Sequence, residues 1–181
     1  MRHCSRCGSR LPHAEPVTCA ACGTSHWRNA KPAGAALVTR AGGELLLVRR
    51  AHDPWRGRWC APSGFCDPGE HPIATAERET LEESGLRVEV TGYLGTWLSY
   101  YAEDDAAESE IGIAVAYYHA RPLREDGFAV DPAEVSEARW FDPDELPARL
   151  APPHALPSVL AAWRAARLAG ETVTPLRDRP A

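Results

Sequence analysis

The chain has 181 residues, of which 44% are hydrophobic and 25% are charged, and its formal net charge is −5. These values are typical of one ordinary globular domain with a small addition, and they exclude two full domains or a low-complexity protein. No apolar run approaches the ~18 residues of a membrane span, and the first residues lack the apolar core of a secretion signal, so we expect a cytoplasmic protein without a membrane partner. The acidic charge argues against a general nucleic-acid binder and suits a protein that collects metal cations.

Four of the six cysteines occur as two Cys-x2-Cys pairs near the start of the sequence, namely Cys4 with Cys7 and Cys19 with Cys22. Four thiolates can surround a Zn²⁺ ion tetrahedrally at about 2.3 Å, and a segment this short cannot fold around an apolar core alone. Two disulfides or four free thiols are the alternatives, although disulfides are typical of secreted proteins. The pairs therefore predict a small rubredoxin-like zinc ribbon over residues 1–30, held by a structural Zn²⁺ ion.

The residues after the ribbon first predict two strands and a loop. Residues 34–39 and 44–50 have the pattern of the two strands of a hairpin, with a turn at Gly42 and Gly43. Residues 56–65 have turn chemistry and predict a loop.

A helix is expected over residues 71–84, because Pro72 suits its first turn and Gly85 suits its end. Strands and helices mix without regular alternation in the rest of the chain, which predicts an α+β domain over residues 31–170. We expect a flexible C-terminal tail over residues 171–181. The remaining expected elements are strands over residues 87–96, 111–120 and 138–141 and a helix over 154–168.

The predicted helix carries three carboxylates on one face. Glu79, Glu82 and Glu83 fall within an arc of roughly 100°, where like charges destabilise an isolated helix by ~0.2–0.5 kcal/mol per pair. Arg78 can offset part of this cost by pairing with Glu82 one turn on. A solvated acidic face is the ordinary interpretation, but Gly64 lies on a loop whose backbone can approach a ligand closely. Carboxylates with a free carbonyl are the hard oxygen ligands that Mg²⁺ or Mn²⁺ prefers, so a divalent-cation site is predicted.

The spacing of these residues resembles the signature of a known family, the Nudix hydrolases. The run Gly64-x5-Glu70-x7-Arg78-Glu79-Thr80-x-Glu82-Glu83-x-Gly85-Leu86 has the length of the 23-residue Nudix box. Its seven fixed positions are all matched, by Gly64, Glu70, Arg78, Glu79, Glu82, Glu83 and Gly85. The flanking segments are also similar, including Leu-Leu-Val-Arg-Arg before the box and Trp140-Phe141-x-Pro143 after it.

The resemblance implies both a fold and an activity. It implies an α/β/α Nudix sandwich with a mixed sheet, and Mg²⁺- or Mn²⁺-dependent hydrolysis of a nucleoside diphosphate linked to another moiety. By position, Glu79, Glu82 and Glu83 would hold the cations together with the Gly64 carbonyl, and Arg78 would hold Glu79 in place. Glu79 is the first choice to orient or deprotonate the attacking water, with a loop carboxylate as the alternative.

Further candidate residues flank the box. Glu70 would either support the metal cluster or cap the helix, and Glu110 (or the nearby Glu108) would be an additional acidic residue. Arg49 or Arg50 could bind phosphate bidentately where the second strand ends. The candidates for substrate binding are Arg49, Arg50, Glu70, Trp97, Tyr100 and Glu110.

A zinc ribbon ahead of a Nudix domain is similar to two groups, the zinc-ribbon FAD or ADP-ribose pyrophosphatases and, less closely, the NADH pyrophosphatases. Both cleave a dinucleotide-type substrate into two monophosphates. NADH pyrophosphatases carry a Ser-Gln-Pro-Trp-Pro-Phe-Pro-like motif after the box, and the corresponding residues 93–103 lack it. A nucleotide-pool sanitising enzyme that acts on nucleoside triphosphates and a non-catalytic nucleotide sensor are the alternatives. A homodimer is an open alternative to a monomer.

Overall fold

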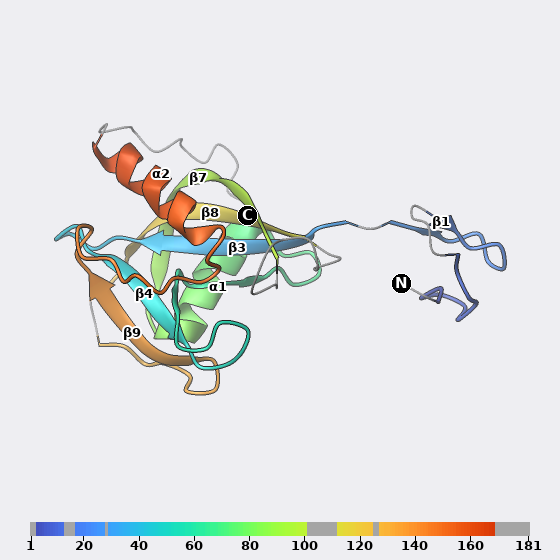
Figure 1. Cartoon of the computed structure of the whole chain (residues 1–181), viewed down its shortest axis with the longest axis horizontal. Coiled ribbons are helices and arrows are strands. Elements are labelled where there is room, and N and C mark those ends of the chain that lie inside the picture. Colours follow the sequence, from blue (N-terminus) through green and yellow to red (C-terminus); the bar gives the residue numbers. More distant parts are fainter. Residues whose placement is uncertain (1–2, 13–16, 28, 101–111, 125–126, 169–181) are drawn as a thin grey trace. The chain divides into compact units, whose positions relative to one another are not determined.

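The chain divides into two compact units, Met1–Ala30 and Lys31–Ala181 (Figure 1). The computed structural model describes residues 3–12, 17–27, 29–100, 112–124 and 127–168. The predicted C-terminal tail lies outside these residues. Within them, no helix is both long enough and apolar enough to cross a membrane.

The first unit is built from two similar cysteine turns. In each turn a glycine N–H donates to the carbonyl of the first cysteine of a pair, Gly8 to Cys4 at 2.9 Å and Gly23 to Cys19 at 2.8 Å. Both glycines have positive φ, +74° and +73°, a backbone conformation that other residues adopt only with strain. The short strands β1 (Val17–Thr18) and β2 (Ser25–His26) pair as an antiparallel ribbon beside the second turn.

These turns gather the four cysteine sulfurs, which all lie within 4.8 Å of one another. The Sγ atoms of Cys4 and Cys22 are 3.6 Å apart, and those of Cys7 and Cys19 are 3.7 Å apart. The cysteines are free, so the disulfide alternative is not what the structure shows. Four thiolates arranged tetrahedrally at about 2.3 Å from a zinc ion would have nearly this sulfur spacing. The cluster is compatible with a zinc ribbon.

The second unit contains two sheets and two helices. The helices are α1 (Pro72–Ser84) and α2 (Leu156–Leu168). The strands of the first sheet are Lys31–Val38 (β3), Ser63–Phe65 (β6), Val88–Ser99 (β7) and Ile113–Pro122 (β8). They lie in the order β6-β3-β8-β7, in which β3 and β8 are parallel and the other neighbouring strands are antiparallel. The other sheet is antiparallel with the order β5-β4-β9, from Leu45–Arg50 (β4), Trp59–Cys60 (β5) and Val135–Phe141 (β9).

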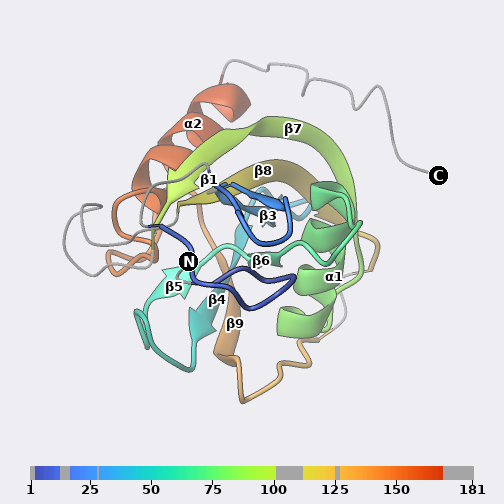
Figure 2. The ribbon, with the colours of Figure 1, turned by 90° about the vertical axis from the view of Figure 1, so that its right-hand side faces the viewer.

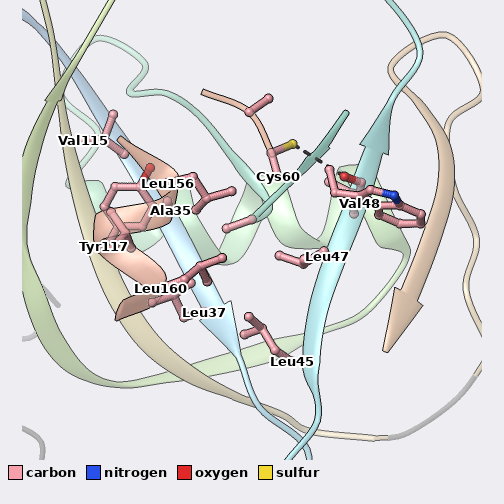
Figure 3. Packing of buried hydrophobic residues seen from close by; sticks show 14 of the residues in the cluster. Ala35, Leu37, Leu45, Leu47, Val48, Cys60, Val115, Tyr117, Leu156 and Leu160 are labelled. Atoms are coloured by element: carbon pink, nitrogen blue, oxygen red, sulfur yellow. Dashed lines mark hydrogen bonds between the residues drawn. The ribbon is translucent and has the colours of Figure 1, made fainter. Parts of the chain in front are cut away.

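The two helices cover opposite faces of these strands, which gives the α/β/α layers of the predicted sandwich (Figure 2). Side chains alternate along a strand, so β3 directs Ala35 and Leu37 toward one cluster and Ala36 and Val38 toward the other. The first cluster contains Leu156, Leu160 and other residues of α2, opposite Leu45 and Leu47 of β4 (Figure 3). The second cluster contains the buried apolar residues of α1, Ile73 and Ala76.

The turn predicted between β3 and β4 is present, with hydrogen bonds from the Arg40 N–H to the Glu44 carbonyl at 3.1 Å and from the Gly43 N–H to the Arg40 carbonyl at 2.8 Å, but the two strands do not pair along their length as a hairpin would. A single antiparallel bridge, between Thr39 and Leu45, joins the end of β3 to the start of β4. Apart from this bridge, β3 belongs to one sheet and β4 to the other. Both strands are buried on both faces, so each needs a helix on one side and apolar cover on the other, and entry into two different sheets supplies both.

The loop expected over residues 56–65 contains the short strands β5 and β6. Strands of two or three residues carry no readable periodicity, and they form through pairing with β4 and β3. This pairing places Gly64 in register with Gly34 of β3.

Helix α1 begins and ends as expected. Pro72 occupies its first turn, and Gly85 ends it in the left-handed conformation, φ 76°, with its N–H donated to Leu81 at 2.8 Å. The helix lies so close to β3 that a Cβ atom at Gly34 would approach the Pro72 carbonyl oxygen to 2.1 Å. Glycine at this position therefore sets the distance between α1 and the sheet.

We predict that Gly34→Ala lowers stability by about 1–3 kcal/mol, or several degrees in Tm, because the methyl group would overlap the backbone of α1. Gly127→Ala is the matched control, since nothing lies within 4 Å of a Cβ atom there. Thermal unfolding followed by circular dichroism measures both variants. Equal Tm values for the two variants would contradict the close packing of α1 on β3.

Candidate active site

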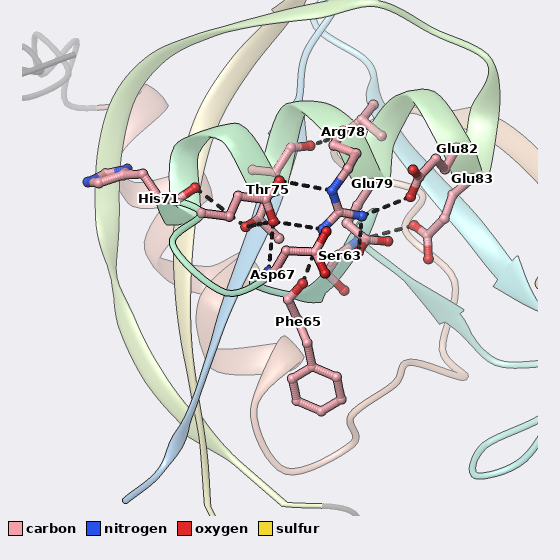
Figure 4. A network of polar contacts seen from close by, with 12 residues as sticks. Ser63, Phe65, Asp67, His71, Thr75, Arg78, Glu79, Glu82 and Glu83 are labelled. Atoms are coloured by element: carbon pink, nitrogen blue, oxygen red, sulfur yellow. Dashed lines mark hydrogen bonds and ion pairs between the residues drawn. The ribbon is translucent and has the colours of Figure 1, made fainter. Parts of the chain in front are cut away.

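The guanidinium group of Arg78, at the centre of α1, binds three carboxylates at once (Figure 4). Its Nε and Nη2 atoms donate to the two oxygens of Glu70, each at 2.9 Å. Its Nη1 atom donates to Glu79 at 2.8 Å and to Glu82 at 2.9 Å, and Nη2 also reaches the Phe65 carbonyl at 3.1 Å. Arg78 therefore connects the loop before the helix, strand β6 and the acidic face of α1.

Glu70 is the main anchor of Arg78. Its Oε2 atom also accepts hydrogen bonds from the Asp67 N–H at 3.0 Å and from the Thr75 hydroxyl at 2.9 Å. The adjacent Arg78 and these further donors lower the pKa of Glu70 to about 2. The ring of His71, and not Glu70, caps the helix. Glu70 thus supports the acidic cluster through Arg78. Both of its carboxylate oxygens accept hydrogen bonds from other residues of the protein.

Glu79 lies directly against the backbone of β6. A Cβ atom at Gly64 would come within 2.0 Å of the Glu79 Oε1 atom, so any other residue at position 64 would displace this carboxylate. Burial raises the pKa of Glu79, and the hydrogen bond and charge of Arg78 act in the opposite direction. The two predicted metal ligands Gly64 and Glu79 are therefore side by side.

Glu83 is the most buried carboxylate of the cluster, with 8% of its surface exposed. Its Oε2 atom accepts a hydrogen bond from the Ser63 N–H at 3.1 Å. Burial raises the pKa of Glu83 to about 8; the Ser63 N–H lowers it, whereas the charges of Glu79 and Glu134 raise it further. A carboxylate in this environment favours a nearby positive charge.

Glu79 and Glu83 line a pocket of about 300 Å³, hereafter the acidic pocket, between α1, β6 and the start of β9. Glu82 is exposed and bound to Arg78 at the outer side of α1, and it does not line this pocket. Four other residues that line the acidic pocket carry groups able to bind a cation, a phosphate or another carboxylate: Arg50, Gly64, Arg78 and Glu134.

The sequence interpretation missed Glu134, which brings a further carboxylate to the acidic pocket. The antiparallel pairing of β9 with β4 places Val135 opposite Arg50, and the Ala51 N–H donates to the Glu134 carbonyl at 2.9 Å. The signal in the sequence was an acidic residue directly before a strand, but the pairing partner of that strand was not readable. The expected additional residues, Glu108 and Glu110, lie outside the described residues.

Of the two candidate arginines, Arg50 and not Arg49 lines the acidic pocket. Arg50 Nε donates to the Pro54 carbonyl at 2.8 Å, which fixes the side chain while leaving part of the guanidinium for a ligand. Arg49 points elsewhere, toward the Gly57 carbonyl at 3.2 Å and Glu137 at 3.7 Å.

A second, largely apolar pocket adjoins the acidic pocket, and we call it the deep pocket. The two share lining residues, including Arg50 and Gly64. Trp97 and Tyr100, two of the candidates for substrate binding, line neither pocket. The aromatic residues that line the deep pocket are Trp55, Phe65 and Tyr117.

We predict that Glu70→Gln lowers stability at pH 7 by about 2 kcal/mol, because it removes a charge-assisted pair from Arg78. The pKa of Glu70 falls from 4.5 to about 2 on folding, so the stabilisation is complete above about pH 5 and is lost as pH falls toward 2. The Tm difference between wild type and variant should shrink over that range.

The matched control is Glu89→Gln, which neutralises a half-buried carboxylate of β7 that is paired with the exposed Arg121. We expect a change below about 0.5 kcal/mol for it. A Glu70→Gln variant with the same Tm as wild type at pH 7 would contradict the anchoring role.

Comparison with known proteins identifies the family. The model of the NUDIX domain matches residues 29–160. The chain is similar to the NAD-capped RNA hydrolase NudC of Stutzerimonas stutzeri, with 31% identity over 160 residues that cover 81% of this chain and 50% of that protein. It is also similar to a MutT-like protein of Streptomyces ambofaciens, with 30% identity over 122 residues, 67% of this chain and 70% of the relative.

Among solved structures, the crystal structure of a NUDIX hydrolase from Nitrosomonas europaea matches with a TM-score of 0.76 and 27% identity, and the match covers 96% of both chains. The chain spans about half the length of the NudC relative. The family model extends over most of the chain, from the end of the first unit into α2. The chain therefore belongs to the Nudix hydrolase family.

Proposed function

We propose that this chain is a Mg²⁺- or Mn²⁺-dependent hydrolase that cleaves the pyrophosphate of a nucleoside diphosphate linked to another moiety, giving two monophosphates. The acidic pocket carries this proposal. Glu79, Glu83 and Glu134 line it together with Gly64, and Arg50 lines the same pocket.

The donor set of this pocket fits a divalent cation. Carboxylate oxygens and a backbone carbonyl are hard ligands, and the buried Glu83 is costly as an anion unless a positive charge lies near it. In the proposal Glu79 and Glu83 hold the cations with the Gly64 carbonyl, while Glu82 contributes from the outer side of α1. Arg78 fixes the carboxylates of both Glu79 and Glu82.

Each remaining residue has a defined part in the proposed reaction. Cations bound in the acidic pocket would neutralise phosphate charge and lower the pKa of the attacking water. Glu79, or Glu134 opposite it, accepts the proton of that water. Arg50, held by the Pro54 carbonyl, donates to a phosphate oxygen. The deep pocket then accommodates a non-phosphate part of the substrate.

The substrate class is tested by a panel of dinucleotide-type compounds with Mg²⁺ or Mn²⁺ and identification of products by mass. FAD, ADP-ribose, NADH and a diadenosine polyphosphate should yield AMP from at least one compound. A curated relative is named a NAD-capped RNA hydrolase, so NAD⁺-capped RNA belongs in the panel. Reaction with 8-oxo-dGTP alone, with release of pyrophosphate, would contradict the proposal.

We predict that Glu83→Gln and Glu82→Gln each lower kcat by about 100-fold or more, because each removes a proposed metal ligand. Glu83→Gln should not lower Tm in metal-free protein, since burial disfavours the ionised form of this side chain. Steady-state kinetics and thermal unfolding are measured on the same samples.

Glu77→Gln is the control on the same helix. Its side chain accepts a hydrogen bond from the Val90 N–H at 3.0 Å, which the amide oxygen of glutamine can replace, and it does not line the acidic pocket. Turnover near the wild-type rate in the Glu83→Gln variant would rule out the proposed site.

We further propose that the four-cysteine cluster holds one structural Zn²⁺ ion. Support comes from the sulfur spacing and from the small size of the apolar cluster of the first unit, which contains Cys4, Leu11 and Cys19 as its fully buried members. So small a cluster cannot stabilise thirty residues without a metal. Backbone hydrogen bonds from Arg6 and Cys7 to the Cys4 sulfur and from Thr24 to the Cys22 sulfur would also stabilise thiolates bound to a metal.

We predict that Cys19→Ser loses the zinc and unfolds the first unit, because a hydroxyl is a poor zinc ligand. Cys66→Ser is the control, since this half-buried cysteine lies outside the cluster. Metal analysis by mass spectrometry should find one zinc per chain in wild type and in the control. Full zinc content in the Cys19→Ser variant would refute the four-cysteine site.

A further inference from the structure

The segment between β4 and β5, residues 51–58, folds back over Arg50, the last residue of β4. The Gly57 N–H donates to the Arg50 carbonyl at 2.9 Å. The Pro54 carbonyl accepts the Nε–H of the Arg50 side chain at 2.8 Å. The same guanidinium group contacts the indole of Trp55, with its Cζ atom 5.9 Å from the ring centre. Both the backbone and a side chain of this segment therefore hold Arg50.

Trp55 has a backbone conformation that a bulky residue seldom adopts. Its φ is +68°, and among the residues that the structure describes it is the one non-glycine residue with positive φ. The Arg58 N–H donates to the Trp55 carbonyl at 3.0 Å, which closes the turn, and 5% of the Trp55 surface is exposed. Strain of this kind persists only where the surrounding structure enforces it, and it is typical of functional sites. At this position the strained turn places an aromatic face against Arg50.

Arg50 shares the acidic pocket with three carboxylates, those of Glu79, Glu83 and Glu134. A guanidinium group that is free to turn would pair with one of them, because charge-assisted pairs are strong where water is partly excluded. Arg50 forms no ion pair with these three residues, all of which the structure describes, although it is near enough for its charge to act on Glu83. An interaction on the other side of the guanidinium group is needed to explain this separation.

We propose that Trp55 is a positioning residue, which keeps the Arg50 guanidinium against the 51–58 segment and away from the carboxylates of the acidic pocket. The carboxylates then stay available for a cation, and the guanidinium stays available for a phosphate oxygen. The inference rests on the proposed function for these two roles. Contact with an indole face attracts the cation without using its N–H groups. The Nη2 atom has only a long contact, 3.5 Å to His52 Nε2.

The position of the guanidinium is measured by proton–nitrogen NMR of arginine side chains in the full-length protein, where Arg50→Lys identifies the Arg50 Nε–H signal. We expect an order parameter close to that of the rigid backbone in wild type. Trp55→Phe keeps an aromatic face and should preserve it. Trp55→Leu keeps an apolar side chain without that face, and the order parameter should fall.

The consequence for the acidic pocket is measured by Mn²⁺ titration of the same variants. Trp55→Leu should bind Mn²⁺ at least about 5-fold more weakly than wild type, because the released Arg50 competes for the carboxylates. The double variant Trp55→Leu/Arg50→Ala should regain wild-type affinity or exceed it, since the competing cation is gone. A second substitution would not reverse a loss that came from damage to the fold.

Trp140→Leu is the matched control. Trp140 also contacts an arginine, with Arg40 Cζ 5.3 Å from its ring, but it lines neither pocket. Its Mn²⁺ affinity and its Arg50 signal should match those of wild type. Where Trp55→Leu folds poorly, Trp55→Met takes its place as a variant without an aromatic face.

Three results would overturn the inference. They are a mobile Arg50 side chain in wild type, unchanged Mn²⁺ affinity in Trp55→Leu, and a loss of affinity that the double variant does not reverse. Failure of the proposed function is recognised separately, because wild type itself would then bind no Mn²⁺ in the acidic pocket. In that case the Arg50 signal in Trp55→Leu and Trp55→Phe alone decides for or against the positioning role.

Discussion

The arrangement of the acidic pocket depends on one guanidinium group. Three carboxylates on consecutive turns of α1 repel one another, and Arg78 compensates by binding Glu79 and Glu82 while Glu70 fixes it from the loop before the helix. Glu83 forms no ion pair with any residue in the part of the chain that the structure describes, and it is instead buried against the Ser63 N–H. The cluster is therefore partly neutralised on its outer side and left with unbalanced negative charge on the side of the pocket, where a cation would complete it.

The topology explains why one helix suffices to build this site. Gly34 lets α1 approach β3, and Gly64, in register beside it, lets Glu79 lie against the backbone of β6. The chain then passes into a second sheet, and the pairing of β4 with β9 brings Arg50 and Glu134 to the same pocket. The close approach that Gly34 and Gly64 allow thus forms one wall of the acidic pocket, and the pairing of β4 with β9 forms another.

The sequence predicted the features that depend on local pattern. The boundaries of α1, the contact of Arg78 with Glu82, and the grouping of four cysteines all follow from spacing within one helix or one turn. The contact of Arg78 with Glu79 was implied by the family resemblance. Features that depend on strand partners were missed: the separation of β3 and β4 into two sheets, the choice of Arg50 over Arg49, and the contribution of Glu134. Trp97 and Tyr100 were chosen for their chemistry alone, and neither lines the deep pocket: Trp97 packs against the core, and Tyr100 is half-buried outside the core cluster.

The most direct test of the account is the crystal structure of the full-length protein soaked in Mn²⁺, with anomalous diffraction used to locate the metal. The account predicts an anomalous peak in the acidic pocket within coordination distance of Glu79, Glu83 and the Gly64 carbonyl. It would be contradicted by an empty acidic pocket at Mn²⁺ concentrations that saturate turnover, or by manganese bound only at surface carboxylates remote from α1.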